Sequence, residues 1–205
     1  MNGSAWISTF GVVFAIIDPF GYVPLFISIT KGNTQEQRTK MLVRACCTAF
    51  AILAVFTVAG DSILSFFGIS IPALQISGGL ILLVVGFEML KVFPVGEKLS
   101  PVEEKEGEEK EDISIVPLAI PMLSGPAAIT TVVVLRSRAS GVLDIGAILV
   151  SVFLTLAFTF VILKSATRIL KGIGITGLNV VTRVMGLLLC AMAVQFVIHG
   201  YHAIK

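Results

Sequence analysis

Six long apolar stretches, separated by shorter polar segments, follow one another along the chain. Each is about 20 residues long or a little more, the length that an α-helix needs to cross the roughly 30 Å hydrocarbon core of a bilayer. Wound as a helix, each stretch would be apolar on every face, a pattern typical of helices that face lipid. The pattern therefore predicts six transmembrane helices, at residues 5–30, 42–60, 72–93, 113–135, 143–163 and 178–199.

One strongly polar segment, residues 94–112, lies between the third and fourth stretches. Six glutamates alternate with two lysines between residues 103 and 111. A segment with so little apolar surface cannot form a packed core, so we expect a solvated acidic linker. It divides the chain into a first three-helix unit at residues 1–93 and a second at residues 113–205.

The composition agrees with a membrane protein and excludes several other classes. Hydrophobic residues make up 56% of the chain and charged residues 14%, and the mean hydropathy is +0.97, which is too apolar for a water-facing surface. A net charge of +2, with dispersed basic residues, argues against nucleic-acid binding. No nucleophile stands beside a base and no phosphate loop occurs, so we expect neither enzymatic activity nor a bound cofactor or metal.

Lysine and arginine are distributed unequally between the two sets of loops. Eleven of them lie in or beside the loops that follow the first, third and fifth stretches, and three lie near the other loops and the C-terminus. Basic loops resist translocation across the membrane. We therefore expect the first set of loops, including the acidic linker, in the cytoplasm and both termini outside the cell membrane.

The two halves share a proline motif when they are offset by 102 residues. Pro19–Pro24 in the first stretch then falls on Pro121–Pro126 in the fourth. At an offset of 104, residues 74–76 in the third stretch fall on similar residues at 178–180 in the sixth. Because each half contains three stretches, an odd number, the second half enters the membrane from the opposite side. The sequence thus predicts an inverted-topology repeat.

Each proline motif is predicted to break its helix. Proline removes a backbone N–H and clashes with the preceding turn, and the glycine inside each motif weakens the remaining hydrogen-bond ladder. Within a bilayer, the freed backbone groups must be buried in protein or line a polar cavity. Matching breaks in two halves are typical of a transporter site, in which half-helix N-termini face an anionic group. The alternative is that both motifs only kink packed helices.

Asp18 is the only charged residue in the first stretch, and Arg183 is the only Lys, Arg, Asp or Glu in the sixth. An intramembrane carboxylate is costly unless it binds something, so we expect Asp18 to hold a substrate ammonium or a coupling proton or sodium ion. A local helix cap is the alternative. Arg183 either pairs with Asp18, contacts a substrate carboxylate, or extends to the interface. The candidate substrate-binding residues are Asp18, Pro19, Gly21, Pro24, Pro121, Ser124, Gly125, Pro126, Thr130 and Arg183.

One glycine motif, Gly172–Gly177, formally matches the dinucleotide fingerprint G-x-G-x-x-G. That fingerprint requires a preceding strand and an acidic residue about 20 positions later, and no Asp or Glu occurs after Asp144. We interpret the motif as a flexible loop between the fifth and sixth helices.

Several segments resemble a known family. Residues 15–26 (Ala-Ile-Ile-Asp-Pro-Phe-Gly-Tyr-Val-Pro-Leu-Phe) and 115–126 (Ile-Val-Pro-Leu-Ala-Ile-Pro-Met-Leu-Ser-Gly-Pro) are similar to the two signature segments of the MarC family of inner-membrane proteins. Residues 76–81 and 182–187 resemble that family's third and sixth spans. The resemblance implies a six-helix inner-membrane protein, some members being transporters that export small neutral amino acids.

Two departures from the family pattern concern the substrate. The second motif commonly continues Gly-Pro-Gly, where this chain has Ala127, and the first commonly has Asn, where this chain has Tyr22. A narrower cavity or a stiffer half-helix is expected at Ala127.

These features together predict a secondary transporter of small neutral amino acids such as alanine or glycine. The substrate would bind near the membrane midplane between the first and fourth helices, and the two halves would alternate access to it. The expected partners are the lipid bilayer and the amino acid substrate. A proton or ion channel is one alternative, and a non-transporting membrane subunit that docks through the acidic linker is another.

Overall fold

The computed structural model describes residues 3–30, 32–90 and 114–204. Within these ranges the regular structure is entirely helical, so the predicted all-α class is confirmed for this part of the chain. One element, η1, is a π-helix, in which each backbone hydrogen bond spans five residues. The elements are α1 (Gly3–Ile17), α2 (Tyr22–Ile29), α3 (Gln35–Phe66), α4 (Ile71–Leu90), η1 (Ser114–Leu123), α6 (Pro126–Ser137), α7 (Val142–Lys164) and α8 (Ala166–His202).

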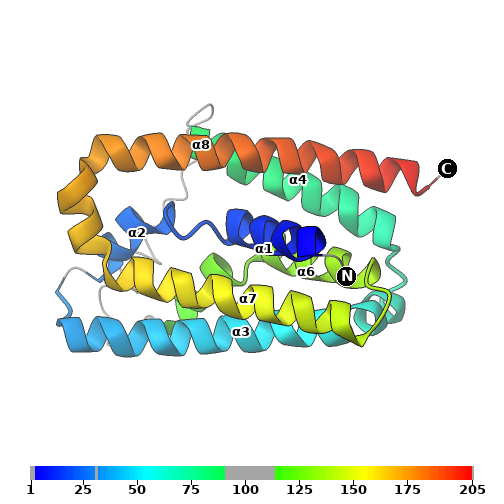
Figure 1. Cartoon of the computed structure of the whole chain (residues 1–205), viewed down its shortest axis with the longest axis horizontal. Helices are drawn as coiled ribbons and strands as arrows, with labels where there is room; N and C mark the ends of the chain where they lie inside the picture. The colour runs from blue at the N-terminus through cyan, green and yellow to red at the C-terminus, as the bar shows by residue number, and fades with distance from the viewer. Residues whose placement is uncertain (1–2, 31, 91–113, 205) are drawn as a thin grey trace.

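The long helices lie side by side along one axis (Figure 1). α3 and α7 form one antiparallel pair, and α4 and α8 form another. α1 and α6 lie between the two pairs, where α1 packs against α7 and α6, and α6 contacts α3 and α4. The shorter helices are therefore held inside a frame of long ones.

Glycine residues bring α4 and α8 unusually close together. A Cβ atom added at Gly86 would lie 2.5 Å from the Cys190 sulfur, and one added at Gly186 would lie 2.8 Å from the Met89 Cβ. Neither helix can carry a larger side chain at these positions without moving away from its neighbour. Close contact at small residues is a common way for membrane helices to associate, because it increases van der Waals packing.

Four of the described helices, α3, α4, α7 and α8, are long and apolar enough to cross a membrane. α1 and α2 meet the same criteria together, as one span bent by 44°, which raises the number to five. α6 is apolar but has only 12 residues, too few to cross a bilayer alone. The prediction of membrane-spanning helices is thus confirmed for four helices, or five with the bent pair.

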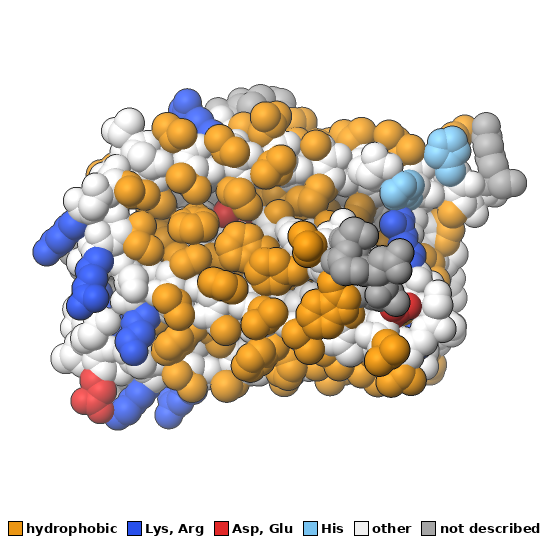
Figure 2. All heavy atoms as spheres, viewed as in Figure 1, with side chains coloured by type: hydrophobic (Ala, Val, Ile, Leu, Met, Phe, Trp, Pro, Cys, Tyr) orange, Lys and Arg blue, Asp and Glu red, His pale blue; other side chains and the backbone are white. Residues whose placement is uncertain are grey.

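The outer surface is largely hydrophobic (Figure 2). Large apolar side chains are exposed along α3, α4, α7 and α8. On the face shown, lysine and arginine side chains gather mainly at the end of the bundle where α3 begins and α7 ends. An apolar middle with charged ends is the distribution expected of a protein surrounded by lipid.

α3 begins seven residues earlier than the apolar pattern predicts, at Gln35 instead of residue 42. Thr34 caps its first turn. The Gln37 N–H donates to the Thr34 Oγ1 at 3.3 Å, and the Thr34 N–H donates to the Gln37 Oε1 at 2.8 Å. Because the first turns of α3 are polar, hydropathy alone does not detect them.

The prediction of a flexible loop before the last helix is wrong. α8 begins at Ala166, so Gly172–Gly177 lies within helical structure. Only Gly174 departs from it, with φ 66° and ψ 176°, and it kinks the helix there. Glycine adopts positive φ without a steric penalty. The chain therefore turns a corner at one residue while both flanks stay helical, as α8 does at the left of Figure 1.

The acidic linker predicted at residues 94–112 lies outside the described residues. The described chain stops at Leu90 and resumes at Ser114. The boundaries of the two three-helix units therefore stay predictions.

Candidate functional site at two helix breaks

The first broken helix is interrupted between Ile17 and Tyr22. Asp18 has a φ of 41°, in the left-handed region that few residues besides glycine, asparagine and aspartate enter. Its N–H still donates to the Phe14 carbonyl oxygen at 3.0 Å, so Asp18 is the last residue on the α1 ladder. The four residues 18–21 make a turn, after which the chain continues as α2.

Asp18 is buried at this break, with only 6% of its surface exposed. Its carboxylate accepts a hydrogen bond from the backbone N–H of Gly21, and a Cβ atom added at Gly21 would overlap the carboxylate. Its Oδ1, however, has no hydrogen-bond partner in the part of the chain that the structure describes. Asp18 therefore caps the turn into α2 and also presents one unused oxygen. A buried carboxylate oxygen without a partner is costly, and a bound cation or proton would relieve that cost.

The second break separates η1 from α6. The N–H and hydroxyl of Ser124 both donate to the Ala119 carbonyl oxygen, at 3.0 and 2.9 Å, which ends the π-helix. Gly125 is extended, with φ −69° and ψ 174°, and Pro126 is the first residue of α6. Since Gly125 occupies the N-cap position, no side chain caps the first N–H groups of α6. The positive end of the α6 dipole thus starts at a buried glycine.

The two breaks are neighbours in space. The end of α1 and the start of α6 pack around a void that has no room for a water molecule. Ile17 immediately precedes Asp18, and Ala128 lies three residues after Gly125, so the helix segments next to the two breaks make this contact, whereas Asp18 and Gly125 do not line the void themselves. The molecule is therefore closed at this point. The residues around the void are Val13, Ile16, Ile17, Leu53, Ala128, Thr131 and Val132.

Thr130 fixes α6 against α4. Its side chain is buried, and a Cβ atom added at Gly78 of α4 would overlap it. The hydroxyl of the neighbouring Thr131 donates within α6, to the Ala127 carbonyl oxygen at 2.8 Å. The glycine at position 78 therefore provides the space that Thr130 occupies.

The residues predicted from the sequence divide into an interior and a surface group. Asp18, Pro19, Ser124, Gly125 and Thr130 are buried and Gly21 is half-buried, whereas Pro24, Pro126 and Arg183 are exposed. The side chain of Pro121 lies outside the described ones. The two exposed prolines affect the break through the backbone, near the starts of α2 and α6, and do not line the interior.

Arg183 does not reach the first break. It is exposed on α8, and among the described residues no ion pair joins it to Asp18. The alternative in which these two side chains form a salt bridge is therefore wrong. The structure is compatible with Arg183 extending to the interface.

Two buried hydroxyls on α7 were not predicted. Ser151 and Thr155 are fully buried, and within residues 3–30, 32–90 and 114–204 neither the Ser151 Oγ nor the Thr155 Oγ1 has a hydrogen-bond partner. They lie one turn apart on the same face of α7, a helix that packs against α1 and α3. This face therefore has unused hydrogen-bonding capacity. Its signal in the sequence is the pair of hydroxyl residues at i and i+4 within an apolar stretch.

Comparison with known proteins agrees with the resemblance noted in the sequence. The family model described as MarC family integral membrane protein matches residues 3–204. The UPF0056 membrane protein MJ1677 of Methanocaldococcus jannaschii is 37% identical, over 98% of this chain and 97% of its own length. The UPF0056 membrane proteins YvbG of Bacillus subtilis and YhcE of Escherichia coli are 36% and 32% identical, covering 90% and 94% of this chain and 88% and 89% of their own lengths.

No solved structure matches this chain. The family match nevertheless extends over almost its whole length, and relatives from an archaeon and from bacteria align with most of it. The chain belongs to the MarC family of integral membrane proteins.

Proposed function

We propose that this protein is a secondary transporter that exports small neutral amino acids such as alanine or glycine. The observation that carries the proposal is the buried Asp18, whose Oδ1 has no hydrogen-bond partner among the described residues, at the end of a helix that packs against the first turns of α6. A carboxylate complements the ammonium group of a zwitterion, or a coupling proton or sodium ion. A helix N-terminus complements the substrate carboxylate.

In this proposal the chain has six spans in two inverted repeats. α1–α2, α3 and α4 form the first repeat, and η1–α6, α7 and α8 form the second. The pairing of α3 with α7 and of α4 with α8 supports this arrangement. So does the contact between Gly86 and Cys190, which are 104 positions apart. This is the offset at which the third and sixth stretches align, and equivalent residues meet where a two-fold axis passes between two helices.

The preference for small side chains follows from the packing at the breaks. The α1–α6 contact is dry and lined by aliphatic residues and one threonine, and Gly21 and Gly125 carry no side chains. Because protein interiors are close-packed, a modest separation of the two repeats opens only a small space. Such a space fits alanine or glycine, and each additional side-chain atom of a larger substrate has to displace packed residues.

Counterflow in proteoliposomes tests the proposal. We expect vesicles preloaded with unlabelled alanine to accumulate labelled alanine or glycine faster than empty vesicles, with saturation and mutual competition, and a proton or sodium gradient to alter the net flux. Ion current without saturable amino acid competition would instead support the channel alternative. A protein that carries neither amino acid flux nor ion current would support the subunit alternative. Deletion of residues 101–111 tests that alternative, because it should abolish association with the partner.

We expect the end of the bundle where α3 begins to face the cytoplasm and both termini to face outward. That end carries Arg38 near the start of α3, Lys164 at the end of α7, and Arg168 and Lys171 near the start of α8, and basic loops resist translocation. In a protein whose native cysteines are replaced by alanine, an impermeant maleimide applied to intact cells should label a cysteine at position 3 and leave one at position 105 unlabelled until the cells are opened. Labelling of only the second position from outside would reverse the orientation.

A further inference from the structure

A basic pocket of about 470 Å³ lies where α3 begins, α7 ends and α8 begins. Arg38 of α3, Lys164 at the end of α7 and Arg168 in the first turn of α8 contribute three positive charges. Gln35, Ser165 and Thr167 complete its lining with an amide and two hydroxyls. The pocket thus contains hydrogen-bond donors and no acidic side chain.

The three cations have no carboxylate partner among the described residues. Arg38 is held in place because its Nη2 and Nε donate to the Thr30 carbonyl oxygen at 2.8 and 3.2 Å, which leaves its Nη1 for another acceptor. The nearest acidic residue in the sequence, Glu36, pairs with Lys40 at 2.8 Å. That hydrogen bond and the Lys40 charge lower the pKa of Glu36, so it stays ionised and engaged outside the pocket. Among the described residues, therefore, no carboxylate compensates the charge in the pocket.

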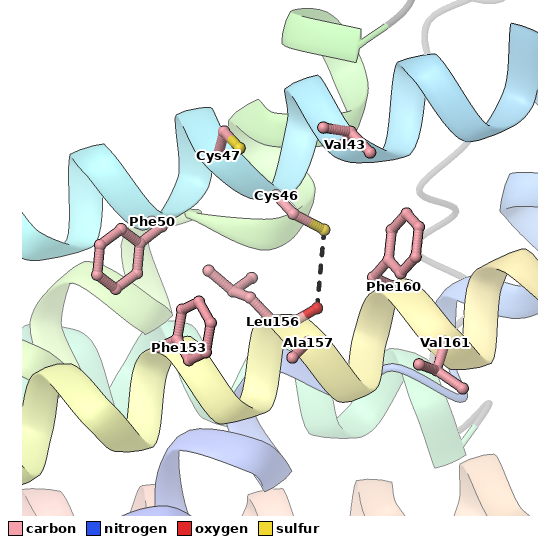
Figure 3. A pocket seen from close by; sticks show the side chains of 9 residues that line it. All are labelled: Val43, Cys46, Cys47, Phe50, Phe153, Leu156, Ala157, Phe160 and Val161. Atoms are coloured by element: carbon pink, nitrogen blue, oxygen red, sulfur yellow. Dashed lines mark hydrogen bonds between the residues drawn. The ribbon is translucent and has the colours of Figure 1, made fainter.

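An apolar groove of about 460 Å³ starts next to this pocket and runs between α3 and α7 (Figure 3). Phe160 lines the groove, and the Lys164 Nζ, one turn further along α7, lies 5.5 Å from the centre of its ring. At the other end the rings of Phe50 and Phe153 meet edge to face, with centroids 6.0 Å apart. Seven residues separate Phe153 from Phe160, so the groove is about 10 Å long. The Cys46 thiol donates to the Leu156 carbonyl oxygen at 3.7 Å, which leaves an almost purely apolar lining.

We propose that the basic pocket and the groove together bind one anionic glycerophospholipid. Its headgroup phosphate would lie among Arg38, Lys164 and Arg168, and one acyl chain would lie along α3 and α7 past Phe160. Arginine guanidinium groups pair well with phosphate oxygens, and cationic side chains at a membrane surface attract anionic headgroups. The order of the two sites, charged first and apolar one helical turn deeper, matches the order of groups in a lipid. This site is separate from the helix breaks.

Lipid titration of the purified full-length protein in neutral detergent tests the proposal, with binding followed by native mass spectrometry and by thermal shift. We expect phosphatidylglycerol to bind about tenfold or more tightly than phosphatidylcholine. Replacing both Lys164→Gln and Arg168→Gln should weaken phosphatidylglycerol binding by roughly thirtyfold, since each basic residue near a membrane surface contributes about a fivefold preference for anionic lipid. The control Lys171→Gln removes a positive charge from the same end, outside the pocket, and leaves the Glu36–Lys40 pair intact, so it should change binding by no more than about twofold.

A variant in the groove and a titration with inorganic phosphate distinguish binding of the whole lipid from binding of its headgroup alone. Ala157→Trp fills the groove and should weaken phosphatidylglycerol binding while leaving the Lys164 and Arg168 side chains in place. Inorganic phosphate alone should produce no more than a small thermal shift. Equal binding of the two lipids, an equal loss in Lys171→Gln and in the Lys164→Gln, Arg168→Gln double variant, an unchanged affinity in Ala157→Trp, or a full shift with inorganic phosphate would each overturn the proposal.

Discussion

Asp18→Asn should reduce amino acid counterflow by a factor of about 10 to 100 while leaving the protein folded and inserted. The factor corresponds to the loss of one hydrogen bond to a charged group, about 1.5–3 kcal/mol. Asparagine has nearly the same shape, tolerates a positive φ, and keeps an oxygen that can accept the Gly21 N–H. The substitution therefore removes the charge of the unpartnered carboxylate and preserves its capping role.

Asp61→Asn is the matched control for this experiment. Asp61 on α3 is half-buried, and its Oδ1 likewise has no hydrogen-bond partner among the described residues. Its Oδ2, however, lies 3.8 Å from an Arg136 nitrogen, a loose ion pair that contributes little. We expect amino acid counterflow by the Asp61→Asn variant to stay within about twofold of the wild-type rate. Asp18→Asn protein that transports at the wild-type rate would show that Asp18 is a helix cap only, and would remove it from the proposed site.

Gly86→Leu should destabilise the protein strongly, because a side chain at this position collides with the Cys190 sulfur and separates α4 from α8. Overpacking a tight contact typically costs about 1–3 kcal/mol. For a chain of this size such a loss lowers the unfolding temperature by roughly 2–12 °C. Thermal unfolding in detergent, followed by size-exclusion chromatography of heated samples, measures the effect.

Gly146→Leu provides the comparison for Gly86→Leu. Gly146 also lies within a long helix, α7, but no atom lies within 4 Å of where its Cβ would be. The unfolding temperature of the Gly146→Leu variant should differ from that of the wild-type protein by no more than a few degrees. If the two variants were equally stable, the close approach of α4 and α8 would be incorrect, and with it the pairing of Gly86 and Cys190 that supports the inverted repeat.

The apolar stretches alone located the four long helices and the bent α1–α2 pair, because burial in lipid demands a continuous run of apolar residues whatever the packing. They could not give the ends of α3 and α8. Residues 35–41 are helical because Thr34 caps them, and residues 166–177 are helical except at Gly174, although glycines occur at 172, 174 and 177. Only Gly174 uses the conformational freedom of glycine. Hydropathy reports where a chain meets lipid and carries no information on a cap or on which glycine bends a helix.

The candidate site was predictable in part. Asp18 was identified as a lone charge in an apolar stretch, and the structure buries it at a break in the helix. Which proline faces inward was not predictable, because a break removes the 3.6-residue period that relates positions on one face. Pro24 and Pro126 thus proved exposed, and Arg183 lies away from Asp18. The π-helical form of η1 also has no signal in hydropathy, which registers side chains and not the hydrogen-bond ladder.

The central claim is that the two breaks form one site for a small amino acid, and substrate protection of a cysteine at Ser124 tests it most directly. In protein with Cys46, Cys47 and Cys190 replaced by alanine, Ser124→Cys should react with a small thiol reagent only when the closed α1–α6 contact opens. The account predicts that saturating alanine or glycine slows this reaction by about tenfold, that lysine leaves it unchanged, and that a cysteine at the lipid-facing Val161 is unaffected. An alkylation rate at position 124 that is the same with and without alanine would contradict the shared site.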